Sequence, residues 1–305
     1  MDLASGWFAG RPAQAGPQIQ AAIELGFRSV SLLPGDPPLQ PGGLSSSTGR
    51  ELGALSERKP DAIGAAAWDA LHPWTARREA AAVASGQSAL QELNFRRISK
   101  VLTALRRLGG SCLVVAAGLD ERPAPQGRGR KLLARLQAGG APKLEEESME
   151  TLGQWALGRE NQWECLARFL FQLRSQAPGL AIAIAADPSP AGLLDLACAE
   201  RLLRDPALSG IGLWLDSGVL QIRQSLGLED VGKWLDRHAA SILGMSLQDY
   251  AEGQDLLAPG EGQVDFPLIA EYLPRSARKV LSLAPSYPGE AVIEARRALG
   301  AWGIA

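Results

Sequence analysis

The stretch GIGLWLDSGVLQIRQSLGLEDVGKWLDRHAASILGMSLQD, residues 210–249, shows the repeating pattern that determines the fold. Two short apolar runs, 210–216 and 241–247, enclose a longer amphipathic stretch. A short apolar run bounded by turn signals is typical of a buried strand, and an amphipathic stretch is typical of a helix that covers it. The stretch therefore predicts a strand–helix–strand unit in a parallel sheet.

The same alternation runs through all 305 residues of the chain. The predicted strands are 28–34, 61–68, 111–118, 180–186, 210–216, 241–247 and 279–285, with a weaker first strand at 5–10. The clearest helical patterns are 17–26, 94–109, 160–176 and 288–303. Eight such units predict a closed (β/α)8 TIM barrel in a single domain. A doubly wound open sheet is the alternative, but no G-x-G-x-x-G follows an early strand to support it.

Glycines mark the ends of some predicted helices, and two irregular stretches interrupt the alternation. Gly26 and Gly109 each precede a predicted strand, which indicates a left-handed helix cap. Residues 34–48 are rich in Pro, Gly and Ser, and residues 119–154 pass from basic to acidic. Both follow the carboxyl end of a strand, where barrels of this type place their sites, so we predict insertions that form a wall or lid. A solvated charged segment is the other interpretation of 119–154.

Composition limits the class of protein. The formal net charge is -2, which gives no general attraction to phosphate backbones, so we expect no nucleic-acid partner. No apolar run reaches the roughly 18 residues that a membrane span needs. The start, MDLASGWFAGRPAQAG, does not resemble an export signal, and we expect a cytoplasmic protein. Cys112, Cys165 and Cys198 lie in apolar runs, as buried free thiols do.

Acidic residues follow the late strands. Asp216 ends an apolar strand, where a carboxylate is costly unless it is paired, hydrogen-bonded or bound to metal. Asp249 occupies a similar place one strand later. Glu261 stands between two glycines, in a turn whose backbone can approach a ligand closely. These three residues are the first site candidates.

The segments 212–220, 245–273 and 279–295, with LSSSTGRELGAL and LTALRRLGGSCLVVAAG before them, resemble the xylose-isomerase-like sugar phosphate isomerase/epimerase barrels. This family is also related to repair enzymes of the endonuclease IV type. The resemblance implies a TIM barrel in which two Glu, one Asp and one His bind a divalent metal such as Mn, Mg, Co or Zn. In such enzymes the metal polarises a carbonyl while the Glu residues move the adjacent proton.

At the positions that the resemblance assigns to the metal, this chain departs from the family. Ala185 stands at the first Glu, Ser246 at the His and Ser282 at the final Glu, whereas Asp216 is kept. One carboxylate and two hydroxyls do not match the affinity of the complete set. We therefore predict no bound metal and no other cofactor. The chain has only two histidines, His72 and His238, too few for a zinc nuclease.

A different set of residues can serve a site at the same rim. The predicted catalytic residues are Asp216, Asp249 and His72, and the predicted ligand-binding residues are Asp187, Ser246, Gln248, Glu261, Ser282 and Trp68. Each of three has another interpretation: His72 as an ordinary loop histidine, Asp187 as a helix cap or turn residue, and Trp68 as packing at the barrel mouth.

Three functional hypotheses follow. The first is a barrel that binds a small polar, sugar-like metabolite or a partner protein without metal chemistry. The second is an isomerase, epimerase or lyase on a sugar-like or keto substrate, metal-independent or with a displaced metal. The third is a scaffold whose mouth is plugged by PGDPPLQPGG, residues 34–43, or by the 119–154 insertion. In each case a homo-oligomer is compatible with the composition.

Overall fold

Eight parallel strands form a closed barrel in the computed structural model, which describes residues 1–9, 15–32, 50, 54, 63–68, 83–138 and 158–304. Its strands are β1 (Asp2–Ala4), β2 (Ser29–Leu32), β3 (Ile63–Trp68), β4 (Cys112–Ala116), β5 (Ala181–Ala185), β6 (Ile211–Asp216), β7 (Ile242–Leu247) and β10 (Arg278–Leu281). The barrel closes because β1 pairs with both β2 and β10. The predicted TIM barrel is thus confirmed.

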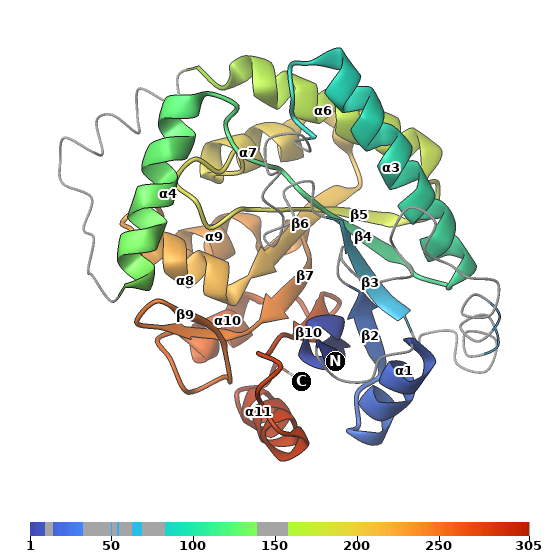
Figure 1. The fold of residues 1–305 in the computed structure, drawn as a ribbon, viewed down its shortest axis with the longest axis vertical. Coiled ribbons are helices and arrows are strands. Elements are labelled where there is room, and N and C mark those ends of the chain that lie inside the picture. The colour runs from blue at the N-terminus through green and yellow to red at the C-terminus, as the bar shows by residue number, and fades with distance from the viewer. Residues whose placement is uncertain are drawn as a thin grey trace.

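Helices surround this barrel (Figure 1). They are α1 (Ala15–Glu24), α3 (Ser88–Arg107), α4 (Pro123–Gln137), α6 (Glu160–Gln176), α7 (Leu196–Arg204), α8 (Ser217–Ser225), α9 (Val231–His238), α10 (Phe266–Tyr272) and α11 (Gly289–Ala301). Gly26 and Gly109 have φ of 84° and 71°, which confirms the predicted left-handed caps. An antiparallel hairpin, β8 (Asp249–Ala251) and β9 (Gln254–Leu257), follows β7.

The first strand lies earlier than predicted. Residues 5–10 were expected to form it, but β1 covers residues 2–4, and residues 5–8 form a short 3-10 helix, η1 (Ser5–Phe8). In that helix Trp7 and Phe8 are both buried and pack edge to face, with ring centroids 4.9 Å apart. A strand would point neighbouring side chains to opposite faces, so two adjacent buried aromatics fit a helical turn better.

The predicted insertion at 119–154 is partly helical. Its described part contains α4, whose Leu132 and Leu136 pack with Leu226 and Tyr250 beside the β8–β9 hairpin. The interpretation of the whole stretch as a solvated charged loop is therefore wrong for α4, which buries an apolar stripe. The remainder from 139 onward, and the predicted insertion at 34–48, lie outside the described residues.

Besides the cluster beside α4, two larger apolar regions stabilise the described part of the fold. The larger one lies between the strands and the surrounding helices. The smaller one fills the barrel interior with Ala4, Cys112, Val114, Ala183, Trp214 and Val280. The three cysteines are buried and free, as predicted. Within the described part of the chain, no helix is long and apolar enough to cross a membrane.

Candidate functional site

The carboxyl ends of neighbouring strands bring several predicted residues together. Asp216 at the end of β6 pairs in register with Ser246 on β7. Ser282 directly follows β10, and its backbone N–H donates to the carbonyl of Leu247 at 3.0 Å. These side chains lie at the end of the barrel where (β/α)8 proteins carry their sites. We define the polar rim as Asp187, Asp216, Ser246, Gln248 and Ser282.

Asp216 is a partly buried carboxylate of the polar rim. Its Oδ1 accepts a hydrogen bond from the backbone N–H of Val219 at 3.0 Å, so the residue caps the N-terminus of α8. The same oxygen accepts a hydrogen bond from Gln248 Nε2 at 2.6 Å. Burial raises the pKa of Asp216 to about 6, despite these two hydrogen bonds that favour the carboxylate. A group with this pKa can hold or release a proton near neutral pH.

Gln248 connects Asp216 to the hairpin. While its Nε2 donates to Asp216, its Oε1 accepts from the backbone N–H of Leu256 at 2.7 Å. Leu256 has a φ of 58°, a conformation that a leucine rarely adopts and that the surrounding contacts must hold. The backbone N–H and carbonyl of Gln248 are both bonded by the Ser217 hydroxyl. Gln248 therefore has a fixed orientation beside Asp216.

Asp249, a predicted catalytic residue, has contacts typical of a structural carboxylate. It is completely buried. Its Oδ2 accepts from the backbone N–H groups of Gly260 and Gly262, both at 2.9 Å, and its Oδ1 from Val264 at 3.0 Å and Tyr250 at 2.8 Å. These four donors occupy the whole carboxylate. They favour a role in holding the Gly-Glu-Gly turn over one in catalysis.

Glu261 lies on the exposed side of that turn. Its Oε2 accepts hydrogen bonds from the backbone N–H of Ala258 at 3.2 Å and from the Tyr287 hydroxyl. Trp7 Nε1 in turn donates to the carbonyl oxygen of Tyr287 at 3.0 Å. This chain of contacts links the turn to the loop before α11 and to η1, at the junction where the barrel closes. The hydrogen-bond partners of Glu261 are thus Ala258 and Tyr287, which do not belong to the polar rim.

Asp187 follows β5 and forms a turn, in line with the alternative interpretation from the sequence. Its Oδ1 accepts from the backbone N–H of Ser189 at 2.8 Å. Two buried arginines hold this loop by its carbonyl oxygens: Arg223 contacts Asp187 and Ser189, and Arg159 contacts Pro190 and Gly192. Sequence patterns did not identify these arginines, because their partners are backbone atoms distant in the sequence.

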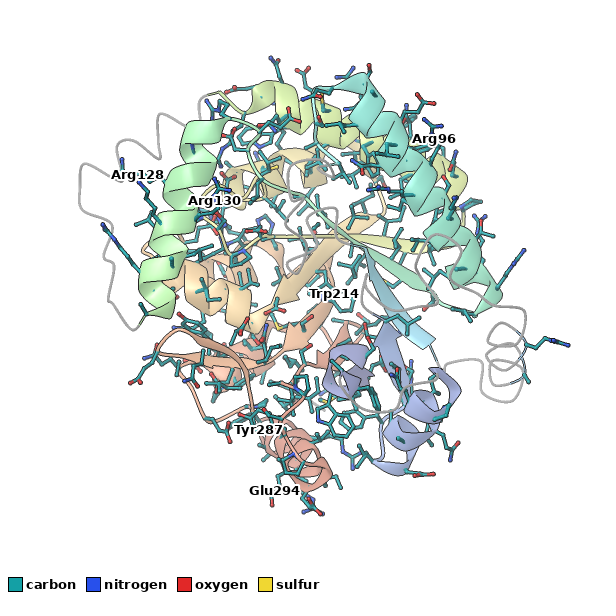
Figure 2. The ribbon with its side chains drawn as sticks, viewed as in Figure 1. Arg96, Arg128, Arg130, Trp214, Tyr287 and Glu294 are labelled. Carbon is teal, nitrogen blue, oxygen red and sulfur yellow. The ribbon has the colours of Figure 1, made fainter. Side chains whose placement is uncertain are left out.

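Trp214 is a further residue of the site that sequence patterns did not identify. Its indole is 5% exposed and lies within the barrel, near the centre of Figure 2. Its Nε1 donates to Ser246 Oγ at 2.9 Å. The sequence feature that could have identified Trp214 is its position two residues before Asp216, which places both side chains on the same face of β6.

Two predicted residues fall wholly or partly outside the described part of the chain. His72 lies outside the described residues, and for Trp68 only the backbone is described, at the carboxyl end of β3. The other histidine, His238, ends α9 and is buried against Trp234. Burial lowers the pKa of His238. His238 is therefore separate from the polar rim.

The residues present do not fit the divalent metal that the family resemblance implies. Asp216 is the only carboxylate among the four implied positions, and the Ser246 hydroxyl already accepts the Trp214 N–H. Among the described residues, no group of three or more His, Cys, Asp or Glu side chains could hold a metal ion. A charged carboxylate set is what such an ion requires.

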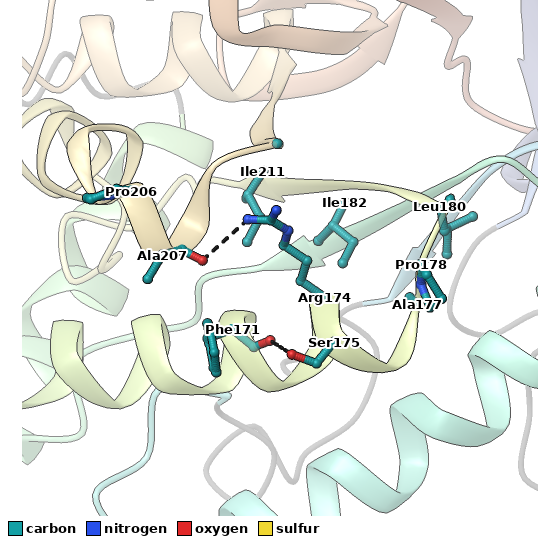
Figure 3. A pocket seen from close by; sticks show the side chains of 12 residues that line it. Phe171, Arg174, Ser175, Ala177, Pro178, Leu180, Ile182, Pro206, Ala207 and Ile211 are labelled. Atoms are coloured by element: carbon teal, nitrogen blue, oxygen red, sulfur yellow. Dashed lines mark hydrogen bonds between the residues drawn. The ribbon is translucent and has the colours of Figure 1, made fainter.

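A groove of about 560 Å³ lies at the opposite end of the barrel, near the amino ends of β5 and β6 (Figure 3). Its lining includes Phe171, Ile182, Ile211 and the charged Arg174, which donates to the carbonyl of Ala207 at 3.3 Å. No residue of the polar rim lines it. This groove is therefore not the candidate site.

No model of a known protein family and no curated protein matches the sequence. Solved structures do match. The apo form of 3-keto-D-glucoside 4-epimerase from E. coli has a TM-score of 0.65 and 14% identity, covering 98% of both chains. D-psicose 3-epimerase with D-tagatose from Clostridium cellulolyticum has a TM-score of 0.67 and 10% identity, covering 99% of this chain and 96% of that one.

The IolI protein with a bound zinc atom has a TM-score of 0.67 and 13% identity, covering 99% of this chain and 97% of that one. Identities this low show a common fold and leave the chemistry of the site to be argued from its own residues. The chain is thus a (β/α)8 barrel with the fold of the xylose-isomerase-like sugar epimerases and isomerases.

Proposed function

We propose that the polar rim binds a small, neutral, hydroxyl-rich metabolite of the carbohydrate type without metal-dependent catalysis. The main observation behind this proposal is the Asp216–Gln248 pair, a carboxylate and an amide 2.6 Å apart at the ends of β6 and β7. A carboxylate accepts and an amide donates and accepts, which suits the hydroxyls of a sugar. The barrel fold shared with epimerases that act on sugars supports this class of ligand.

The other contacts support a binding site whose geometry is set before the ligand arrives. Gln248 is held by Ser217 and Leu256, and the loop carrying Asp187 is held by Arg159 and Arg223. Side chains that are already ordered lose little conformational entropy on binding. The positions of three implied metal ligands are occupied by Ala185, Ser246 and Ser282. These substitutions support ligand binding without catalysis at the same rim.

Thermal shift and calorimetric titration with keto sugars, inositols and sugar phosphates, in buffer with chelator, test this proposal. We expect at least one neutral polyol or sugar to bind, and Asp216→Ala to weaken it at least about tenfold, which is about 1.4 kcal/mol. Asp230→Ala is the matched control, because Asp230 caps α9 through Lys233 N at 3.0 Å as Asp216 caps α8. Equal affinities of the two variants would contradict the proposal.

The second candidate is an isomerase, epimerase or lyase in which Asp216 moves a proton, with His72 as a partner. It is favoured by the pKa of Asp216, raised to about 6, which suits a general acid or base. The test is exchange of solvent deuterium into the carbon next to the substrate carbonyl, followed by NMR. Incorporation that Asp216→Asn abolishes would establish this activity. No incorporation from any sugar of the panel would count against it.

We also propose a cytoplasmic location, no nucleic-acid partner, and a homo-oligomer as one permitted state. They are checked by fractionation, by an electrophoretic shift assay and by light scattering of the purified chain. The metabolite is the partner that the polar rim itself supports.

A further inference from the structure

Trp214 lies along the inner surface of the neighbouring strand β7. Its position pairs in register with Gly244, and a Cβ added at Gly244 would lie 2.3 Å from the benzene part of the indole. At the other end of the ring, Nε1 is 2.9 Å from Ser246 Oγ. The indole therefore covers β7 from position 244 to position 246.

Small neighbours make room for this ring. Gly244 has no side chain, and Ser246 has only a hydroxyl. On the other side of β6, Ala185 of β5 is the register partner of Trp214, and Ala183 belongs to the same interior cluster. Barrel interiors are closely packed, often with small residues beside large ones. Four small residues thus leave the space that the Trp214 side chain fills.

A larger side chain at position 246 would collide with the indole. Nonbonded carbon atoms need about 3.5 Å or more, whereas a hydrogen bond permits the 2.9 Å seen here. An imidazole oriented like the Ser246 side chain would place a ring carbon near the present hydroxyl and its other ring atoms beyond it. One of the two rings would have to move.

We propose that the indole of Trp214 occupies the space that a metal-binding imidazole at position 246 requires. Substitution of the ligands is then only part of the loss of the implied metal site. The barrel interior has been repacked around an aromatic ring that excludes the ion. This inference deepens the metal-free part of the proposed function, on which it rests. It makes Trp214 a second obstacle to a metal ion, in addition to the ligands that are missing at positions 185, 246 and 282.

A stability cycle tests the collision. Ser246→His is made in the native chain and in a Trp214→Val background, and thermal midpoints are compared with chelator present. We expect Ser246→His to lower the midpoint by about 5 °C in the native chain and by less than half as much in the Trp214→Val background, because overpacking is relieved there. Ser246→Ala, which removes only the hydroxyl, is the control for loss of the hydrogen bond.

A metal titration tests the consequence. The variant Ala185→Glu/Ser246→His/Ser282→Glu is compared with the same variant carrying Trp214→Val, using Mn²⁺ and Zn²⁺ alone in calorimetry. We expect at least about tenfold tighter binding when Trp214 is shortened. The control is the same triple variant carrying Leu215→Ala in place of Trp214→Val. Leu215 is a buried neighbour that packs toward the helices.

Equal stability costs in the two backgrounds, or equal metal affinities including no binding by either variant, would overturn the proposal. Neither measurement contains a sugar. A negative result here therefore concerns Trp214 alone, whereas a negative sugar panel concerns the proposed ligand.

Discussion

Asp216 combines a structural and a chemical property in one carboxyl group. It caps α8 and lies beside Gln248, and its burial raises its pKa to about 6. An ordinary surface aspartate at a helix N-terminus would be stabilised in its charged form. At this position the cost of burial outweighs that stabilisation.

The first prediction concerns the pH dependence of stability. Because the pKa of Asp216 rises from 3.8 to about 6 on folding, the folded protein binds this proton more tightly than the unfolded chain. The carboxyl group contributes stability that is fully present below about pH 4 and is lost as the pH rises through about 6. Asn keeps a capping oxygen and cannot ionise. Asp216→Asn should therefore gain stability relative to the native chain between pH 4 and pH 7.

Urea unfolding at pH 4, 5, 6 and 7 measures this difference. Asp230→Asn, in the exposed cap of α9, is the matched control. A difference between Asp216→Asn and the native chain that does not change with pH would show that Asp216 titrates normally.

At the scale of elements, the segment from β8 to α10 depends on one buried carboxylate. Asp249 holds the backbone of Gly260, Gly262 and Val264, and a Cβ at Gly262 would lie 2.3 Å from its Oδ1. The glycine is needed because the carboxylate approaches the backbone this closely. The Gly-Glu-Gly turn is thus a consequence of Asp249 and not an independent ligand loop.

The second prediction is that Asp249→Ala destabilises the protein by about 2–4 kcal/mol, because it leaves several backbone N–H groups without their acceptor. Hydrogen exchange at residues 258–264 should rise more than exchange in β4 and β5. Glu271→Ala, on the exposed face of α10, should change stability by less than about 0.5 kcal/mol. If Asp249→Ala were equally mild, the structural role would be refuted.

At the scale of the whole molecule, the barrel encloses one interior and is enclosed by the helical layer. Cys112 belongs to the interior cluster, and Cys198 to the layer between strands and helices. Burial raises the pKa of Cys112 to about 11 and also raises that of Cys198. Neither thiol is exposed or ionised in the folded chain, so labelling must await opening of the fold.

The third prediction is that a chromogenic disulfide reagent labels the folded chain only slowly and labels all three thiols at once in urea. Labelling rates should follow the unfolding equilibrium when denaturant is varied below the transition. Cys112→Ser removes the interior thiol and should reduce the count in urea by one. Immediate reaction of any thiol in the native chain would contradict the described packing.

The sequence by itself predicted the barrel and a polar rim at its strand ends with Asp216 and Gln248, and its resemblance to the isomerase/epimerase barrels pointed to Ser246 and Ser282. Apolar periodicity and strand ends are local properties of the chain, so they can be read without coordinates. Only the tertiary structure decided that Asp249 holds a turn, that two buried arginines hold the β5 loop and that Trp214 covers β7 beside Ser246. These contacts join residues distant in the sequence, and their distances depend on strand register and close packing, which no local pattern encodes.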